Sequence, residues 1–236
     1  MKLFYGSIEK DSVVIDEQEA HHISKVLRMQ SGEKISVTDG KGGIAHGVLS
    51  LAGKNIILKV SKIEKNLPNN NIPRLHIAIA LIKNMDRLEY FVEKSTEMGI
   101  SEITFLLTEN TERKNLNLNR IIKQSVAASK QSLRVYFPRI NPLIKFSEFV
   151  DNLSENQIFI AHCDDTLPRI SLSEIPKNRD YLFFIGPEGD FSRKEIFSLK
   201  EKNVMSVSLG KGRLRTETAG VLVSAWNCLH MNTGSE

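Results

Sequence analysis

Apolar residues are spaced in two different ways along this chain. In the first sixty-odd residues, short β-branched runs alternate with glycine-containing turns, which is typical of short strands. The predicted strands cover residues 13–15, 34–38, 44–51 and 55–63, with turns at 39–43 and 52–55. One predicted helix, over 17–29, interrupts them. This pattern predicts a small β-barrel or β-sandwich.

After residue 73 the pattern changes to strands that alternate with helices. The predicted strands are 75–81, 103–107, 157–161, 181–185 and 204–209, and the predicted helices are 83–98, 118–133, 192–202 and 216–230. Fully apolar strands joined by helices indicate a parallel sheet covered on both faces. The stretch between the two patterns holds two prolines and no periodicity. We therefore expect an α/β chain with domains 1–67 and 74–236 and a linker over 68–73.

Composition narrows the class of protein. Apolar residues make up 41% of the chain and charged residues 25%, as in ordinary soluble globular proteins. No apolar run reaches membrane-spanning length, and the first residues lack the apolar core of a signal peptide. The two cysteines, Cys163 and Cys228, form no disulfide framework. We expect a cytoplasmic protein without a membrane partner.

Positive charge is concentrated in one segment. Residues 111–145 hold eight lysines and arginines against one acid, Glu112, whereas the whole chain has a net charge of +4. Such a cluster favours a polyanionic partner, although a solvated helix face explains it about as well. The candidate RNA-binding residues, two of them from the first domain, are Lys25, Arg28, Arg113, Lys114, Arg120, Arg134 and Arg139.

Two glycine-containing loops follow predicted strands of the second domain. They read GPEGDFS over 186–192 and LGKGRLRTETA over 209–219. Ligands of open α/β sheets bind beyond the carboxyl ends of strands, so two such loops predict two walls of one pocket. Neither loop has the spacing of a P-loop or of a dinucleotide-binding motif. Each loop alone is better explained as a simple turn between a strand and a helix.

Together these loops resemble the signature of the ribosomal RNA small-subunit methyltransferase E family, which belongs to the SPOUT (trefoil-knot) methyltransferases. The segment HHISKVLR (21–28) with Gly32, the helix over 83–100 and the segment QSLR (131–134) with Pro138 agree with this family in order and spacing. The resemblance covers nearly the whole chain. Two positions depart from the family pattern: Asp190 replaces a usual glycine, and Gly212-Arg213 replaces an arginine followed by an aliphatic residue.

The resemblance implies a fold, a reaction and partners. It implies an N-terminal PUA-like β-barrel that helps to hold RNA and a C-terminal knotted α/β domain that binds S-adenosylmethionine and forms a homodimer. It further implies methylation of N3 of one uridine in 16S rRNA, on the 30S subunit. Two alternatives stay open: a SPOUT enzyme that acts on another RNA, such as tRNA, and a non-catalytic RNA-binding assembly factor.

Site residues follow from the same resemblance. Arg215 is expected to hold the substrate phosphate or to favour the uridine anion. Glu188 and Glu217 are weaker candidates for a base, and we favour a structural role for both. We expect the cofactor to contact Ile185, Gly186, Gly189, Leu209, Gly210, Leu214, Thr218 and Ala219. No metal is expected, because neither His21-His22 nor the run 162–165 forms a complete ligand set.

Overall fold

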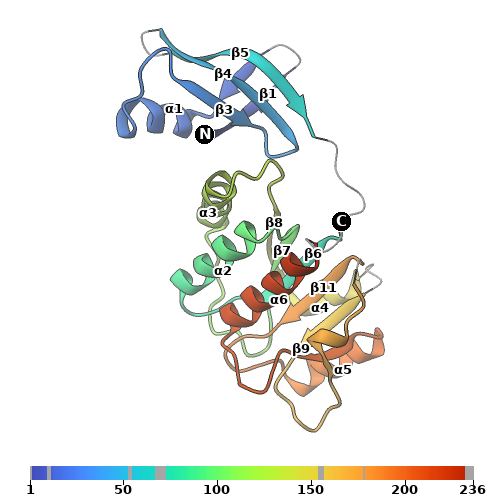
Figure 1. Ribbon diagram of the computed structural model, residues 1–236. Helices are drawn as coiled ribbons and strands as arrows, with labels where there is room; N and C mark the ends of the chain where they lie inside the picture. The colour runs from blue at the N-terminus through green and yellow to red at the C-terminus, as the bar shows by residue number, and fades with distance from the viewer. Residues whose placement is uncertain are drawn as a thin grey trace. The chain divides into compact units, whose positions relative to one another are not determined.

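The computed structural model describes residues 2–9, 12–52, 55–66, 73–153, 157–177 and 179–231. The chain forms two compact units (Figure 1). One consists of Met1–Asn69 with Val126–Phe137, and the other of Asn70–Ser125 with Pro138–Glu236. Of the predicted linker, residues 68–72 lie outside the described residues. Each unit is described here by itself.

The N-terminal unit is built on a five-stranded sheet with the order β2-β1-β3-β4-β5. The strands are β1 (Leu3–Ile8), β2 (Val13–Ile15), β3 (Lys34–Thr38), β4 (Gly43–Ala52) and β5 (Asn55–Lys65). The edge strands β2 and β5 also contact each other, so the sheet curls into a half-closed barrel. Strand β1, which pairs with β3 in parallel, has no counterpart in the sequence prediction.

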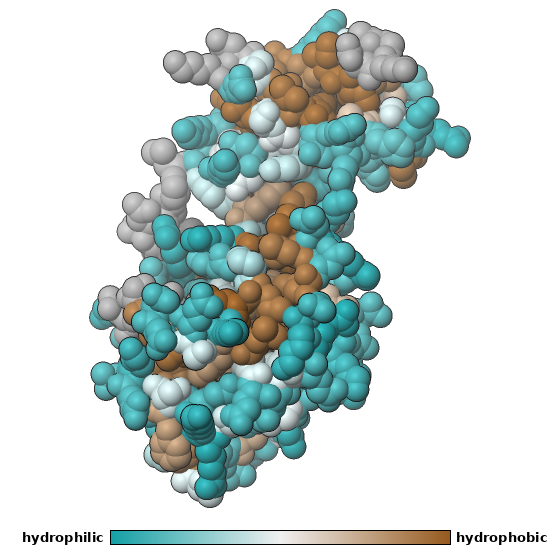
Figure 2. Space-filling model, turned by 180° about the vertical axis from the view of Figure 1, so that it is seen from behind, coloured by the Kyte–Doolittle hydropathy of each residue, from teal (hydrophilic) through white to brown (hydrophobic). Residues whose placement is uncertain are grey.

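A short helical segment packs against this sheet. It consists of α1 (Glu17–His21) and a π-helical turn (His22–Val26), and Asp16 caps its start by accepting the N–H of Gln18 at 2.9 Å. Ile23 is fully buried against the sheet. Apolar surface remains on this unit (Figure 2), and its strands carry the exposed residues Val14, Ile57 and Ile63.

The segment 126–137 joins the N-terminal unit through backbone pairing with the turn between β3 and β4. The N–H of Gly42 donates to the carbonyl of Val135, and the N–H of Phe137 donates to that of Gly40, both at 2.9 Å. Lys130 on α3 (Leu118–Gln131) forms an ion pair with the buried Glu19. The predicted division of the chain at 68–73 placed this segment in the second domain.

The C-terminal unit contains a seven-stranded sheet in which every neighbouring pair is parallel. The order is β10-β12-β9-β11-β6-β7-β8. Its strands are β6 (Leu75–Ala80), β7 (Glu102–Leu107), β8 (Arg139–Lys145), β9 (Ile158–Ala161), β10 (Ile170–Ser171), β11 (Tyr181–Ile185) and β12 (Met205–Ser208). The predicted α/β fold with a parallel sheet is confirmed. Strands β8 and β10 were not predicted.

Helices cover both faces of this sheet. The helices of this part are α2 (Met85–Glu97), the first turns of α3, α4 (Phe146–Asp151), α5 (Arg193–Glu201) and α6 (Thr216–Met231), with a short 3-10 turn at Leu172–Glu174. Alternate residues of β11 serve the two faces: Phe183 packs in the cluster of α2 and α6, and Phe184 packs in that of α4 and α5. In the described part of the chain, no helix is long and apolar enough to cross a membrane.

Helices α2 and α6 run side by side (Figure 1), and they approach each other closely. A Cβ added at Gly220 of α6 would lie 2.4 Å from the Phe91 ring of α2, so this position needs a glycine. The hydroxyl of Ser224 then donates to that of Ser95 at 2.8 Å. This tight pair brings the N-terminal turns of both helices to the same edge of the sheet, where the strands of the sheet end.

Candidate functional site

A cavity of about 300 Å³ lies at the carboxyl ends of three neighbouring parallel strands. The loop after β11 supplies residues 185–188 and Asp190, the loop after β12 supplies 207–210 and 212–215, and the loop after β9 supplies 161–163. Arg87 of α2 and the first residues of α6 complete the wall. Ligand sites of parallel α/β sheets lie in this position. The sequence prediction that two glycine loops form one pocket agrees with this arrangement.

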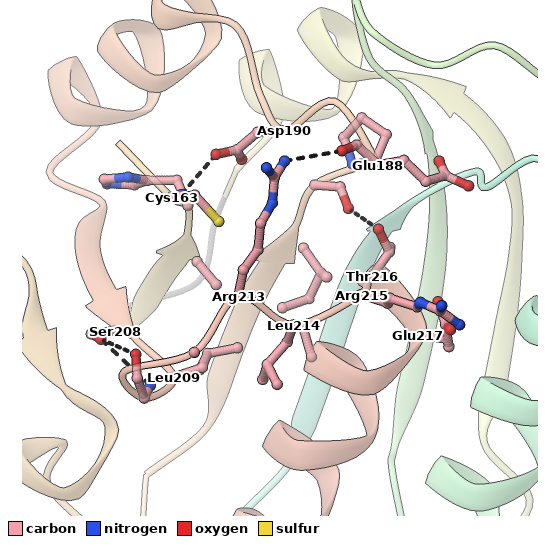
Figure 3. Close-up of a pocket in the computed structure, with 18 of the residues that line it drawn as sticks. Cys163, Glu188, Asp190, Ser208, Leu209, Arg213, Leu214, Arg215, Thr216 and Glu217 are labelled. Atoms are coloured by element: carbon pink, nitrogen blue, oxygen red, sulfur yellow. Dashed lines mark hydrogen bonds between the residues drawn. The ribbon is translucent and has the colours of Figure 1, made fainter. Parts of the chain in front are cut away.

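Hydrogen bonds fix the three loops to one another (Figure 3). The hydroxyl of Thr216 donates to the carbonyl of Gly186 at 2.8 Å, which ties the start of α6 to the loop after β11. The N–H of Cys163 donates to Oδ2 of Asp190 at 2.7 Å, which ties the loop after β9 to the same loop. The Arg213 guanidinium donates to the carbonyl of Glu188 at 3.3 Å. The cavity is therefore framed mainly by backbone groups held by short side chains.

Two residues of these loops have left-handed backbone conformations. Gly210 has a φ of 136°, which side-chain-bearing residues rarely adopt. Asp190 has a φ of 63°, although it is not a glycine. Its two carboxylate oxygens accept the N–H groups of Cys163 and Phe191 at 2.7 and 2.8 Å, respectively. These bonds offset the strain of the Asp190 backbone. They also explain how this chain holds an aspartate at a position that favours glycine.

Glu188 and Glu217 both line the cavity, and both have protein partners. Oε1 of Glu188 accepts the N–H of Lys83 at 3.2 Å. Oε1 of Glu217 lies 3.8 Å from Nε of Arg87, and the Glu217 side chain is 10% exposed. Each carboxylate thus holds a neighbouring segment, which supports the structural role favoured for both from the sequence.

Three arginines line the cavity on the side of α2 and α6, namely Arg87, Arg213 and Arg215. Arg215 comes directly before α6, and its carbonyl accepts the N–H of Ala219 at 2.8 Å. Its exposed guanidinium has no hydrogen bond or ion pair to another described residue. Arg87 and Thr216 were not predicted. Arg87 is 128 residues from Arg215 and carries no local motif, whereas Thr216 is recognisable as the first residue of a predicted helix.

The loop after β9 contributes His162 and Cys163 to the cavity wall. Burial lowers the pKa of the His162 imidazole, which keeps the ring neutral near pH 7. Burial and the neighbouring Asp190 carboxylate raise the pKa of the Cys163 thiol. A thiol that stays protonated is a poor nucleophile, so this pair does not resemble a Cys-His centre. No cluster of metal-ligand residues is found within the described ranges.

The structure brings most predicted cofactor contacts to the cavity wall. Those that line it are Ile185, Gly186, Leu209, Gly210, Leu214 and Ala219. Gly189 and Thr218 do not line it. Gly189 lies against Asn110, whose Nδ2 donates to the Gly189 carbonyl at 3.2 Å, and Thr218 is exposed on the first turn of α6. Gly189 and Thr218 each follow a residue that lines the cavity, but the turn of the backbone places them outside the cavity wall.

Several predicted RNA-binding residues are engaged within the protein. Arg120 forms an ion pair with Glu89, and the Arg139 guanidinium lies 3.9 Å from the Glu102 carboxylate. Arg113 donates to the carbonyl of Lys83 at 3.1 Å, and the Lys114 ammonium donates to that of Thr111 at 2.6 Å. Arg134 is half-buried and has a partner as well.

The remaining two candidates, Lys25 and Arg28, are exposed in the N-terminal unit. Their side chains project from the end of the π-helical turn, where Arg28 has a φ of 49°. The predicted RNA contacts therefore fall into two sets: internally paired residues of the basic segment and these two exposed residues.

Comparison with known proteins defines the class that this fold and cavity represent. A family model described as an RNA methyltransferase domain matches residues 68–227, and one described as an RNA methyltransferase PUA domain matches residues 15–61. The molecule is thus an RNA methyltransferase with a PUA-like domain and a SPOUT-type parallel sheet. The predicted fold class is confirmed.

Individual relatives narrow this class. The ribosomal RNA small subunit methyltransferase E of Synechocystis sp. is 30% identical over 91% of this chain and 72% of the relative. A solved structure, described as a probable rRNA-methyltransferase from Porphyromonas gingivalis, is 33% identical, covers 100% of both chains and superposes with a TM-score of 0.89.

A third relative shares the fold at lower identity. The ribosomal RNA small subunit methyltransferase E of Neisseria gonorrhoeae, whose structure was solved with S-adenosyl methionine, is 24% identical over 95% of both chains, with a TM-score of 0.81. This chain belongs to the ribosomal RNA small subunit methyltransferase E family.

Proposed function

We propose that this enzyme transfers the methyl group of S-adenosylmethionine to N3 of one uridine of 16S rRNA in the 30S subunit. The observation that carries the proposal is the cavity at the ends of β9, β11 and β12, framed by two glycine loops and bordered by the exposed guanidinium of Arg215. The names of the curated relatives agree with an rRNA substrate.

The cavity wall fits the proposed cofactor. Apolar side chains of Ile185, Leu209, Leu214 and Ala219 offer a surface for a flat adenine ring, and the backbone of Gly210 has open space where a side chain would stand. The cofactor supplies a methyl group that its sulfonium already activates, so the main task of the protein is to align the two reactants. Gly189 and Thr218 are not part of this proposed contact set.

Uridine N3 carries a proton that must leave before or during methyl transfer. Glu188 and Glu217 each hold a neighbouring group, the N–H of Lys83 and the Arg87 guanidinium respectively, which favours a structural role for both. Arg215 is the better candidate for direct contact with the nucleotide. A guanidinium stays charged and can hold a phosphate or stabilise an anionic uridine ring. The target base must also be unpaired or flipped to reach the cavity.

The test is the Arg215→Ala variant. We expect it to abolish methylation of 30S subunits from a strain that lacks the gene, while calorimetry finds S-adenosylmethionine binding mostly intact. Mass mapping of 16S rRNA from that strain should find one uridine without its methyl group, and the wild-type protein should restore it. Near-normal methylation by Arg215→Ala would refute the role of Arg215. If 16S rRNA from the strain that lacks the gene carries the same methyl groups as wild-type 16S rRNA, the substrate is another RNA, such as tRNA.

RNA binding is proposed to involve the N-terminal domain, residues 1–67, as well as the basic segment. The exposed Lys25 and Arg28 are the first candidates, since most residues of the other set already have partners. Neutralising Lys25 and Arg28 together should weaken binding to 30S subunits and flatten its salt dependence. An unchanged salt slope would favour the solvated-surface interpretation.

We also propose that the enzyme is a cytoplasmic homodimer. Helix α6 supports a dimer interface, since Leu229 is 69% exposed and Val221 and Leu222 are half-buried. Trp226 of the same helix instead belongs to the core, where its ring lies 5.2 Å from that of Tyr181. Sedimentation of wild type and Leu229→Glu tests this: a dimer that dissociates in the variant supports the interface, and a wild-type monomer rejects it.

A further inference from the structure

Arg87 is a cavity residue whose position is fixed by two independent contacts. Oδ1 of Asn84 caps α2 and accepts the N–H groups of Asp86 and Arg87 at 2.9 and 3.3 Å. At the other end of the side chain, Nε of Arg87 lies 3.8 Å from the buried carboxylate of Glu217. The helix cap thus holds the backbone of Arg87, and Glu217 holds its guanidinium at the cavity wall.

The charges around Glu217 are unbalanced. Arg87 and Arg215 each carry one positive charge and Glu217 carries one negative charge, which leaves a net charge of +1. The part of the chain that is described provides no further hydrogen bond or ion pair for either guanidinium. The Arg87 side chain is only 41% exposed, so its remaining N–H donors are partly withdrawn from water. Such donors favour an anionic ligand.

We infer that Arg87 and Arg215 together bind one phosphodiester of the target nucleotide and that Glu217 orients Arg87 for this contact. The inference rests on the proposed RNA-methylating function and adds a second substrate-binding residue to it. A phosphodiester carries one permanent negative charge, which would balance the net charge of +1 on Arg87, Arg215 and Glu217. Guanidinium donors match phosphate oxygens in pairs, and the contact of Nε with Glu217 leaves the terminal nitrogens for this purpose.

This role differs from stabilisation of an anionic uridine ring. A phosphodiester is charged before, during and after methyl transfer, so its contact contributes to RNA binding in the ground state. The ring becomes anionic only as its proton leaves, so a contact to the ring would act on kcat and on its pH dependence. The two roles therefore predict different kinetic losses for the same substitution.

The experiment compares Arg87→Ala, Arg87→Lys and a matched control, Arg179→Ala. Arg179 is exposed just before β11, at the strand end opposite to the cavity. Dissociation constants for 30S subunits from the deletion strain are measured at several potassium chloride concentrations. The same variants are tested for kcat and KM, and for S-adenosylmethionine binding by calorimetry.

We expect Arg87→Ala to raise KM and Kd for 30S subunits about tenfold, as for loss of about 1.4 kcal/mol of binding energy. The slope of log Kd against log salt should fall by part of the value for one whole phosphate contact, about 0.7 to 0.9, because Arg215 still contacts the same phosphodiester. Arg87→Lys should keep the slope but recover only part of the affinity. The kcat of Arg87→Ala, its cofactor affinity and all values of Arg179→Ala should stay within about twofold of wild type.

Three results would overturn the inference. An unchanged Kd and salt slope would mean that Arg87 does not contact phosphate. A loss confined to kcat, with a shifted pH profile, would mean that Arg87 contacts the uridine ring instead of the phosphodiester. An equal loss of cofactor affinity would make Arg87 a support for the fold of α6. If wild type itself leaves 30S subunits unmethylated, the proposed function fails instead, and that result is seen before any variant is compared.

Discussion

The two sides of the cavity are built from different parts of the polypeptide. On the loop side, residues 186–188, 190, 208–210 and 212 present mainly backbone, held by hydrogen bonds such as that from Thr216 to Gly186. On the arginine side, formed by Arg87, Arg215 and Glu217, long charged side chains face the cavity. Both guanidiniums there have N–H donors that no other described residue accepts. A backbone surface is rigid and specific in shape, whereas free guanidiniums attract anions over a distance.

This difference separates the two ligands of the proposed reaction. The loop side fits a cofactor that must be held in one orientation, because hydrogen bonds already fix its loops to one another and its apolar wall is preformed. The arginine side fits a charged polymer that must arrive and leave. Substitutions on the loop side should therefore act on cofactor affinity, and those on the arginine side on RNA.

The strongest test on the loop side is a matched pair of glycine substitutions. Gly210→Ala places a side chain on a φ of 136°, which costs about 1–3 kcal/mol unless the loop rearranges. A Cβ at Gly212 would meet no atom within 4 Å, and Gly212 does not have a positive φ. We expect Gly210→Ala to weaken S-adenosylmethionine binding tenfold or more, by about 1.4 kcal/mol per factor of ten, and Gly212→Ala to change it little.

The readouts are calorimetry with S-adenosylmethionine and filter binding of 30S subunits. Gly210→Ala should leave 30S binding close to that of wild type, the reverse of the loss expected for Arg215→Ala. Equal losses for both ligands in Gly210→Ala would show that the two sides of the cavity are one cooperative unit.

A smaller effect is expected at the hydrogen bond that joins the loop to α6. Thr216→Val keeps the shape of the side chain but removes the donor to the Gly186 carbonyl, which is buried. The loss should be about 1 kcal/mol, or about fivefold in cofactor affinity. Ser198→Ala is the control, because the Ser198 hydroxyl donates to the carbonyl of Glu195 within α5 and Ser198 does not line this cavity. Equal cofactor affinities of Thr216→Val and Ser198→Ala would refute a role of the Thr216 hydrogen bond in cofactor binding.

The sequence predicts the loop side far better than the arginine side. GPEGDFS and LRTETA are contiguous, so a glycine pattern after an apolar strand already indicates the turn, the strand end and the following helix. The helix predicted over 192–202 starts with a capping box of Ser192 and Glu195, two residues only three positions apart in the sequence. Contacts of this kind lie within a few residues of each other, where spacing determines geometry.

The arginine side depends on contacts between distant segments. Arg87 meets Glu217 only because α2 and α6 pack closely at Gly220, a position that looks like any helical glycine in the sequence. The pairing of residues 135–137 with the turn at Gly40 also cannot be predicted from the sequence, because the two segments are far apart along the chain. Sequence spacing also cannot show that Arg120 and Arg139 have acidic partners, so the basic segment overstates the charge available for RNA.

Asp190 offers a test of the backbone strain on the loop side. Asp190→Ala loses the bond to the Cys163 N–H and keeps the left-handed φ of 63°. Asp190→Gly loses the same bond but removes the strain, which is about 1 kcal/mol for a single residue. The glycine variant should therefore be more stable to urea than the alanine variant by about that amount. Equal stability of the two would mean that the loop leaves the left-handed region in solution.

The smallest effect concerns pH. Burial lowers the pKa of His162 below its usual 6.5, so the unfolded chain binds the proton more readily than the folded one. The stability that the neutral ring contributes is thus complete above about pH 6.5 and is lost as pH falls through this value towards the folded pKa. The arginines stay charged throughout this range. Mild acid should therefore loosen the loop side before it changes the arginine side.

Urea unfolding and cofactor titrations from pH 8 to pH 5 check this order. Wild type should lose more stability than His162→Asn over this range, because only wild type carries the imidazole whose pKa burial lowers in the folded state. His21→Asn, which changes an exposed histidine of the N-terminal unit, should follow the wild-type curve. If S-adenosylmethionine and 30S binding weaken together in wild type as pH falls, the two sides of the cavity do not respond separately.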